Sequence, residues 1–170
     1  NCVKFIQELE EGDVLLFNDP YISGTHLNDL TILKPIFLGG RLIAIVMNKA
    51  HHVDVGGPLP ASINPNARTL YEEGLIIPPV KIMKKGEFAK EILEIIKSNF
   101  KVPMAFLADL NAQISADLEG EKRIKELIDK VSLSKFNEAN IEAFRYSKRI
   151  VEKHLNEFKG NQCEAEDYIE

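Results

Sequence analysis

Two β-rich segments joined through a pair of glycines constrain the fold of this chain more than any other feature. Leu30–Phe37 and Arg41–Met47 are rich in branched and aromatic residues, and Gly39-Gly40 lies between them. Consecutive glycines supply the positive φ angles of a tight hairpin turn. The sequence therefore predicts an antiparallel hairpin, with a further short strand at Val14–Phe17.

The segments on either side of this hairpin also favour strands and loops. Residues 51–68 contain repeated Gly, Pro, Asn and Ser, which predicts a long ordered loop. Leu75–Met83 is apolar, but Pro78-Pro79 confines it to a sheet edge or an extended segment. Residues 1–87 are therefore expected to form a strand-and-loop region.

Helical spacing of apolar residues replaces this pattern over residues 88–158. A first helix begins near Phe88, a second covers residues 103–131, and a third runs from Lys135 to Phe158. The second helix is expected to bury Leu107, Leu110, Ile114 and Leu118. The apolar stripe of the third consists of Ile141, Phe144, Val151, Leu155 and Phe158. The predicted fold class is α+β, a β-rich N-terminal half followed by a bundle of about three helices.

Gly120 lies inside the second predicted helix, where glycine costs roughly 0.5–1 kcal/mol relative to alanine. The helix either continues through this residue or divides in two there. We expect a close contact that requires the missing side chain, so that Gly120→Ala destabilises the protein by overpacking.

The bulk composition disfavours several classes of protein. The 170 residues are 45% hydrophobic and 28% charged with a net charge of −5, as in an ordinary globular domain. Basic residues form no stripe or block, so no nucleic-acid partner is expected. The longest apolar runs, such as Leu42–Met47, are too short to cross a bilayer, so no membrane partner is expected. Cys2 and Cys163 are isolated, which favours a reducing cytoplasm.

The two ends of the sequence have the patterns of interior segments. Residue 1 is Asn rather than Met, and Val3–Leu9 has the pattern of the end of a helix. Residues 159–170 are expected to open a further strand, beginning near Glu164. We therefore expect one compact unit that is part of a larger subunit. Four apolar residues are expected to contact the rest of that assembly, namely Val3, Phe5, Ile6 and Ile169.

Three of the four histidines lie in a stretch that is also rich in aspartate, glycine and proline. His26 and Asp29 are three residues apart, and such a pair can chelate one divalent ion through an imidazole nitrogen and a carboxylate oxygen. The alternative is a turn in which Thr25 and Asp29 cap backbone groups and His26 faces solvent.

His51 and His52 follow the predicted hairpin. Adjacent residues on an extended chain point to opposite faces, so one of them serves a given site and the other packs or hydrogen-bonds beside it. Asp54 either ligates an ion, orients a histidine, or forms a tight turn with Gly56-Gly57.

Other polar positions have two interpretations each. Asn18 and Asp19 follow an apolar strand, where sites commonly gather, although Asn18-Asp19-Pro20-Tyr21 also has the composition of a turn. Glu72-Glu73 can act as general base and acid or form a solvated turn.

The helical region contains fewer candidates. Asp109 and Gln113 share a helix face, and a local side-chain pair accounts for their spacing. His154 lies among charged residues and is expected at the surface. The sequence contains no G-x-S-x-G nucleophile motif and no G-x-x-x-x-G-K-[ST] phosphate loop.

The order and spacing of these motifs resemble the hydantoinase B family over nearly the whole chain. That family includes the B subunits of ATP-dependent N-methylhydantoinases, the corresponding half of 5-oxoprolinase and a subunit of acetone carboxylase. The resemblance rests on Gly12-Asp13-Val14, Asn18-Asp19-Pro20-Tyr21, Gly24-Thr25-His26-Leu27-x-Asp29, Ala50-His51-His52-x-Asp54-Val55-Gly56-Gly57, Tyr71-Glu72-Glu73-Gly74-Leu75, Ile77-Pro78-Pro79-Val80-Lys81, Asp109-Leu110-x-Ala112-Gln113 and Glu164-Ala165-Glu166-Asp167-Tyr168.

The resemblance implies an enzyme divided between two subunits. Family members are much longer than this chain, and they pair with an A subunit that carries the ATP site. ATP phosphorylates the carbonyl oxygen of a stable amide or ketone there, and the B subunit holds a divalent metal and completes the reaction. The implied partners are a hydantoinase A-type subunit, the remaining C-terminal part of the B subunit and a small cyclic amide substrate.

The resemblance also implies roles for individual residues. The metal ligands fall on His26, Asp29 and His51, with a further aspartate ligand upstream of this chain. Imidazoles and carboxylates suit Zn²⁺, Mn²⁺ or Fe²⁺ with an open coordination position. A metal-bound water, with its pKa lowered toward about 7, can attack an activated carbonyl carbon. Three neighbouring residues are candidates for orienting ligands or relaying a proton, namely Asn18, His52 and Asp54.

An ATP- and metal-dependent hydrolase of cyclic amides is therefore the main functional hypothesis. One alternative is an ATP-dependent ketone carboxylase, in which the activated ketone becomes an enolate that captures carbon dioxide. A second alternative is a non-catalytic segment retained for assembly.

Overall fold

The computed structural model describes residues 5–23, 26–62, 64–158, 160 and 164–167. The chain divides into two compact units, residues 1–123 and residues 124–170. The α+β class is confirmed, because an antiparallel sheet in the N-terminal half is followed by helices. Val3 and Ile169, and both cysteines, lie outside the described residues.

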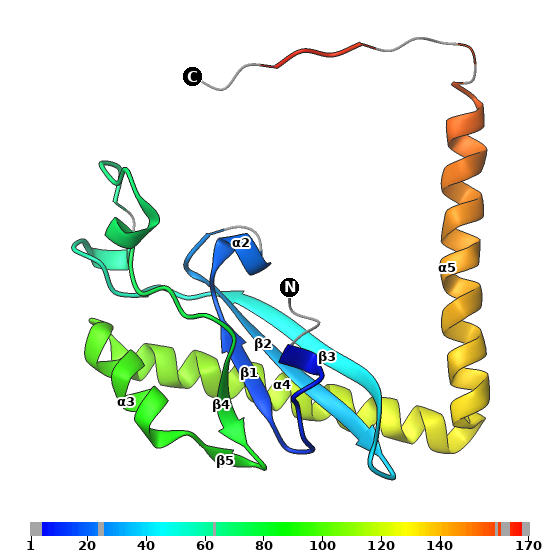
Figure 1. The fold of residues 1–170 in the computed structure, drawn as a ribbon, viewed down its shortest axis with the longest axis horizontal. Coiled ribbons are helices and arrows are strands. Elements are labelled where there is room, and N and C mark those ends of the chain that lie inside the picture. The colour runs from blue at the N-terminus through cyan, green and yellow to red at the C-terminus, as the bar shows by residue number, and fades with distance from the viewer. Residues whose placement is uncertain (1–4, 24–25, 63, 159, 161–163, 168–170) are drawn as a thin grey trace. The chain divides into compact units, whose positions relative to one another are not determined.

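One antiparallel sheet organises the first unit (Figure 1). Within the described residues its strands are β1 (Val14–Phe17), β2 (Asp29–Leu38), β3 (Arg41–His51), β4 (Val80–Lys84) and β5 (Glu87–Phe88), in the spatial order β3-β2-β1-β4-β5. The predicted hairpin is confirmed, since Gly39 and Gly40 join β2 to β3 with φ angles of 58° and 75°. Both strands are longer than predicted, and β3 continues to His51.

The strand that follows Pro78-Pro79 does not lie at the edge of the sheet. β4 pairs with β1 on one side and with β5 on the other. It begins at Val80, directly after the two prolines, so neither ring interrupts the hydrogen bonds of the sheet. The prolines therefore mark the start of an inner strand, and of the two predicted alternatives the edge position does not hold for β4.

The helices are α2 (Pro20–Ser23), α3 (Lys90–Asn99), α4 (Pro103–Val131) and α5 (Leu133–Asn156), with short 3₁₀ turns at Pro60–Ser62 and Leu70–Glu72. Helix α4 is continuous through Gly120. Of the two predicted alternatives, one helix or two helices divided at this residue, the first is observed. Helix α3 begins two residues later than predicted, because Phe88 pairs with Met83 in the sheet.

The main core lies between one face of the sheet and helices α3 and α4. Alternate residues of the strands point to this face, which follows from the two-residue period of a strand. Its buried members are Val14, Leu16, Leu27, Leu30, Ile32, Val55, Ile77, Ile82, Ile96, Phe100, Phe106, Leu110 and Ile114. Helix α4 thereby covers the face of β2 opposite to the side chain of Leu33.

The buried face of α4 differs from the prediction at one position. Leu110 and Ile114 are buried and Leu107 packs against the core, but Leu118 is 50% exposed. Asp117 occupies the buried position instead, and Leu118 is turned from it by about 100° around the helix. The apolar pattern of the sequence did not indicate that a polar residue would lie at this contact.

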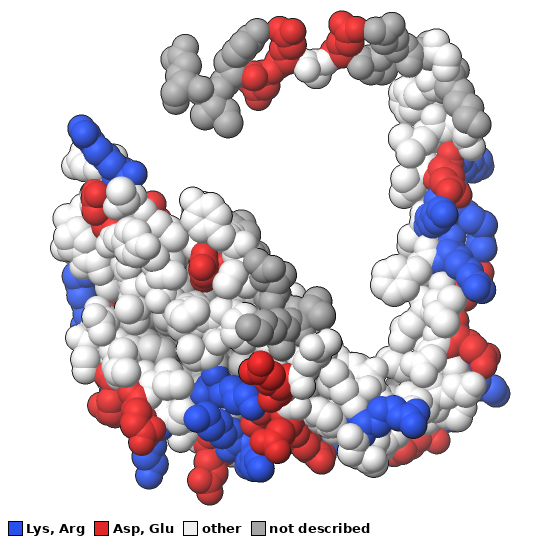
Figure 2. Space-filling view, viewed as in Figure 1, with Lys and Arg blue, Asp and Glu red and all other residues white. Residues whose placement is uncertain are grey.

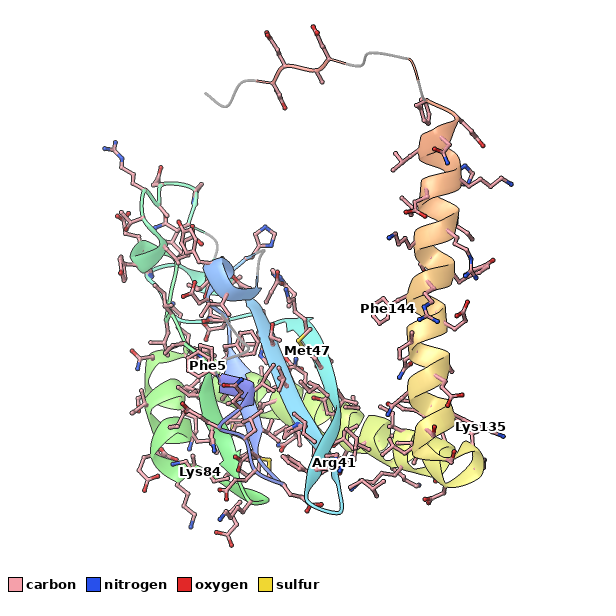
Figure 3. All side chains as sticks on the ribbon, turned by 45° about the vertical axis from the view of Figure 1, so that its right-hand side comes forward. Phe5, Arg41, Met47, Lys84, Lys135 and Phe144 are labelled. Atoms are coloured by element: carbon pink, nitrogen blue, oxygen red, sulfur yellow. The ribbon has the colours of Figure 1, made fainter. Side chains whose placement is uncertain are left out.

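The other face of the sheet carries a smaller cluster of Leu9, Leu15, Phe17 and Leu33. Phe5 and Ile6, which are helical, pack against this cluster as half-buried residues. The face includes an apolar groove of about 460 Å³, and Met47 of β3 lines it with its side chain largely exposed (Figure 3).

Charged side chains gather at the margin of the sheet near the turn between β4 and β5 (Figure 2). Lys81 Nζ lies 2.6 Å from Asp13 Oδ2, and Lys85 Nζ lies 3.3 Å from Glu10 Oε1. Burial by itself raises the pKa of Asp13, but Lys81 and the backbone N–H groups of Glu10 and Lys85 hold it below its ordinary value.

The second unit contains all of α5, whose amino end is capped by Ser132 accepting a hydrogen bond from the Lys135 N–H. Its predicted apolar stripe is exposed, and Phe144 projects from the helix with 80% of its surface accessible (Figure 3). Residues 164–167 have no regular secondary structure, and Tyr168–Glu170 lie outside the described residues. Among the described helices, none is both long enough and apolar enough for a membrane span.

The contact predicted at Gly120 can be tested by a double-mutant cycle with Val46. A methyl group at Gly120 would lie 3.1 Å from Val46 Cγ1 on β3. We expect Gly120→Ala to lower the melting temperature of the wild-type chain. In the Val46→Ala background the added methyl group has room. Alanine at position 120 should then stabilise the helix by roughly 0.5–1 kcal/mol and raise the melting temperature. Thermal unfolding followed by circular dichroism measures both effects, and stabilisation in both backgrounds would contradict the overpacking.

Candidate metal centre

His26, Asp29 and His51 converge at one end of the sheet. Asp29, the first residue of β2, is paired directly with His51, the last residue of β3. His51 Nδ1 lies 2.7 Å from Asp29 Oδ1, and His26 Nδ1 lies 3.8 Å from Asp29 Oδ2. One potential ligand atom from each residue lies within 4.8 Å of the other two. The three residues that the family resemblance implies as metal ligands therefore lie around one point.

The cluster is accessible and its parts are unequally exposed. The side chains of His26 and His51 are 76% and 56% exposed, whereas that of Asp29 is 12% exposed. The two imidazole rings meet edge to face, with centroids 5.9 Å apart. A small ion can therefore approach the two imidazoles from solvent while the carboxylate between them stays fixed.

The Asp29 part of the turn interpretation is also observed, and Thr25 lies outside the described residues. The His26 N–H donates to Asp29 Oδ2 at 3.0 Å, and the Asp29 N–H donates to the His26 carbonyl at 3.0 Å. This turn places the His26 ring beside the carboxylate, so the local structure and the ligand geometry have the same origin.

A pocket of about 310 Å³ opens beside the cluster. Its lining residues are His26, Asn28, His51, Ser62, Asn64 and Glu73. Asn28, Ser62 and Asn64 had not been singled out from the sequence, because each belongs to a segment whose composition indicates only a turn or loop. Glu73 had been considered only as half of a Glu72-Glu73 pair.

The structure separates these two glutamates. Glu72 accepts hydrogen bonds from the Arg68 N–H and the Thr69 hydroxyl at 3.2 and 3.0 Å, so it stabilises an exposed turn. Glu73 faces the pocket, and its carboxylate makes no hydrogen bond or ion pair within the described part of the chain. The solvated-turn interpretation therefore suits Glu72 alone.

Asn18 is fully buried at the end of β1 and joins three segments. Its amide group donates to the carbonyls of Leu27 and Leu75 at 2.8 and 3.0 Å and accepts from the Ile77 N–H at 2.7 Å. Each of these partners is a backbone group of a loop that borders the site. Asn18 thus holds the loop of His26 against the segment that follows Glu73.

His52 points away from the pocket, as alternation along an extended chain requires. It is buried against Phe106, and its Nε2 lies 2.9 Å from Gln113 Oε1 on α4. The His52 backbone exchanges hydrogen bonds with Asn28, whose side chain donates to the His52 carbonyl at 2.8 Å. His52 therefore supports the strand end that carries His51.

Asp54 is buried and organises the start of α4. It accepts from the N–H groups of Val102 and Gly56, each at 2.9 Å, and from the N–H of Lys101. Burial by itself raises the pKa of Asp54, but these N–H donors and the Lys101 charge outweigh it and hold the pKa below its ordinary value. Among the described residues, the pocket lining includes neither Asn18, His52 nor Asp54.

The Gly56-Gly57 pair is required by close backbone approach. Both residues have positive φ angles, and a Cβ at Gly57 would lie 2.5 Å from the Glu73 carbonyl oxygen. The tight turn therefore brings the segment of Glu73 against the loop that follows His51. His154, which belongs to the second unit, lies at the surface, as expected.

The family model described as hydantoinase B/oxoprolinase matches residues 1–170. The chain belongs to the hydantoinase B/oxoprolinase family. It is 47% identical over its whole length to an uncharacterized protein of Methanocaldococcus jannaschii, covering 31% of that protein. It is 40% identical over 76% of its length to the caprolactamase beta subunit of Pseudomonas jessenii, covering 22% of that subunit. It is 34% identical over 96% of its length to the 5-oxoprolinase of Saccharomyces cerevisiae, covering 14% of that enzyme.

Solved structures give the same assignment of fold. The crystal structure of the ATP-dependent caprolactamase from Pseudomonas jessenii matches 83% of this chain with a TM-score of 0.79 and 36% identity, over 24% of the chain in that crystal. A nucleotide-free acetone carboxylase matches 75% of this chain, over 17% of its own, with a TM-score of 0.71. At 20% identity the second likeness shows the fold alone. This chain spans about a third or less of the length of these relatives.

The role of Asp54 makes a testable prediction about acid stability. Because its folded-state pKa is lowered, its stabilisation is complete above the unfolded value of about 3.9 and is lost as the pH falls through the folded value. We expect Asp54→Asn to cost about 1–3 kcal/mol near pH 7, since buried N–H groups lose an acceptor. The difference in the free energy of unfolding between wild type and Asp54→Asn should shrink below about pH 4.

Urea unfolding between pH 3 and pH 7 measures this difference. The control is Asp109→Asn, because Asp109 is an exposed residue of α4. It should leave the free energy of unfolding equal to that of wild type at every pH. A constant difference between wild type and Asp54→Asn across the whole range would contradict the role assigned to the Asp54 charge.

Proposed function

We propose that this chain is the metal-binding part of the B subunit of an ATP-dependent hydrolase of cyclic amides. The observation that carries the proposal is the convergence of two imidazoles and a carboxylate on one accessible point beside a pocket. The caprolactamase and 5-oxoprolinase among its relatives are named for cyclic-amide substrates, which supports this substrate class.

The donor set fits a divalent transition-metal ion. Two histidines and one carboxylate are ligands typical of Zn²⁺, Mn²⁺ or Fe²⁺, and three protein ligands leave coordination positions open. In this proposal His26, Asp29 and His51 hold the ion, with a further aspartate ligand from sequence upstream of residue 1. The ion would supply Lewis acidity and an activated water for attack on a carbonyl carbon.

The remaining pocket residues have roles that suit an amide substrate. The amide of Asn28 and the hydroxyl of Ser62 are engaged with backbone groups, so they shape the wall of the pocket. Glu73 has a free carboxylate at the pocket, and we propose it as a candidate for proton transfer. Asn18, His52 and Asp54 then act by positioning other groups, since Asn18 bonds to backbone carbonyls, His52 to Gln113, and Asp54 to backbone N–H groups and to the Ser62 hydroxyl.

ATP is assigned to a partner in this proposal. The sequence has no P-loop, and an unreactive lactam needs activation before a water can attack it. We propose that a hydantoinase A-type subunit phosphorylates the carbonyl oxygen, and that the C-terminal part of the B subunit completes the assembly in the cytoplasm. The names of relatives as subunits, beta of caprolactamase and B of a hydantoinase, support a hetero-oligomer.

A ketone carboxylase subunit is the second candidate function. The observation in its favour is the shared fold with acetone carboxylase. Assays with ATP and the complete complex separate the two functions, because the hydrolase opens a lactam ring and the carboxylase consumes bicarbonate with a ketone.

Metal binding can be tested on the chain itself. We expect isothermal titration with Zn²⁺ or Mn²⁺ to show one site per chain. His26→Ala, Asp29→Asn and His51→Ala should each weaken affinity by more than about tenfold, since removal of a ligand exceeds the effect of losing an outer partner. His154→Ala, a surface histidine, should leave affinity unchanged. Equal affinity in all four variants would contradict the shared site.

Activation in trans gives a separate prediction. The purified chain with ATP and 5-oxoproline or a hydantoin should produce no ring-opened product. The complete B subunit with its A-type partner should do so, and Glu73→Gln in that complex should lower kcat by about 10²–10⁴-fold if Glu73 transfers a proton. Turnover by the chain without an A subunit would overturn the division of labour.

A further inference from the structure

Gln113 of α4 contacts both strands that carry the metal centre. Its amide nitrogen donates to the Leu30 carbonyl at 3.0 Å and to Asn48 Oδ1 at 2.8 Å. Its amide oxygen lies 2.9 Å from His52 Nε2. Leu30 adjoins Asp29 on β2, and His52 adjoins His51 at the end of β3. One buried side chain thus bonds next to two of the three candidate ligands, from the opposite face of the sheet.

The orientation of the Gln113 amide is determined by its partners. The Leu30 carbonyl can only accept, so the nitrogen of the amide must face it. Both hydrogens of that nitrogen are used, and the amide oxygen therefore faces His52. An amide oxygen can only accept, so His52 must carry its hydrogen on Nε2. His52 Nδ1 makes no hydrogen bond within the described residues, which agrees with an unprotonated nitrogen.

The same polarity continues along the helix. Asn48 Nδ2 donates to Asp117 Oδ1 at 2.7 Å and to the Gln113 carbonyl at 2.9 Å. Three side-chain hydrogen bonds therefore run in one direction, from His52 to Gln113, from Gln113 to Asn48, and from Asn48 to the carboxylate of Asp117. Burial raises the pKa of Asp117, and the Asn48 hydrogen bond and the charge of Lys34 oppose this effect. A row of bonds with one direction leaves no member free to rotate without breaking several contacts.

We propose that Gln113 is a positioning residue of the metal centre, which holds His52 in its Nε2–H form and clamps the ends of β2 and β3 so that His51 faces Asp29. This proposal rests on the proposed function for the role of His51 and Asp29 as ligands. The tautomer and the clamp are properties of the chain itself. The spacing of Asp109 and Gln113 had a simpler explanation in a local pair, but Gln113 bonds to the sheet instead.

The tautomer of His52 is the first measurement. Long-range ¹H–¹⁵N spectra of the chain with labelled histidine identify the protonated ring nitrogen, and His26→Gln, His51→Gln and His154→Gln assign the signals. We expect wild-type His52 to be protonated at Nε2. Gln113→Met removes the acceptor and should change the tautomer or produce a mixture. Gln113→Glu keeps an acceptor and the shape of the side chain, so it should retain the Nε2–H form.

Metal affinity is the second measurement, with Zn²⁺ as the probe. Gln113→Met should weaken Zn²⁺ binding by about tenfold, the lower end of the range for partners of metal ligands. Gln113→Glu loses the donors to Leu30 and Asn48 and should also weaken it, although the tautomer is kept. Leu110→Ala is the matched control, since it destabilises the same helix through the core without touching these polar groups. It should lower the melting temperature and leave both the tautomer and the affinity unchanged.

The outcomes separate this proposal from the proposed function. An Nδ1–H tautomer in wild-type His52, or an unchanged tautomer in Gln113→Met, overturns the role of Gln113. Equal losses of affinity in Leu110→Ala and Gln113→Met at similar melting temperatures also overturn it, since the effect is then general destabilisation. If the wild-type chain binds no Zn²⁺ while the tautomer follows the predicted pattern, the metal function fails and the positioning of His52 stands.

Discussion

The register between β2 and β3 is the constraint on which the candidate site depends. It places Asp29 directly opposite His51, so a carboxylate and an imidazole from residues far apart in the sequence come within 2.7 Å. A shift of β3 by one residue would turn the His51 side chain to the face covered by α4. The two-residue glycine turn and the register shift between Ile36 and Phe37 together set this pairing. The candidate metal centre is therefore a consequence of how one hairpin is aligned.

Buried polar side chains maintain that alignment after the hairpin has formed. Asn18 and Asp54 bond to backbone groups outside the strands and helices, and Gln113 bonds to the Leu30 carbonyl of β2. A buried N–H or carbonyl without a partner costs about 1–3 kcal/mol, so each of these side chains fixes a loop or strand end in place. Buried hydrogen bonds thus hold the backbone around the pocket, and the imidazoles of His26 and His51 are exposed to solvent.

Much of this arrangement could be predicted from the sequence, and the failures have identifiable causes. The hairpin, a helical region over residues 103–131 and the choice of His26, Asp29 and His51 as candidate ligands follow from local patterns and from the family resemblance. The edge position of β4, one of two alternatives drawn from Pro78-Pro79, and the burial of Leu118, predicted from helical spacing, were wrong because both depend on neighbours from elsewhere in the chain. Glu73 and Gln113 had ordinary local interpretations because their partners are distant in sequence.

The sequence by itself determined the hairpin, its glycine turn, the helical region over residues 103–131 and the residue types able to bind an ion, because these depend on spacing within one segment. The tertiary structure alone decided that His51 faces the pocket and His52 faces the helix. It also decided that Glu73 lies at the pocket while Glu72 supports a turn. Those choices depend on contacts between segments, and contacts of that kind are set by the packing of a whole sheet against its helices.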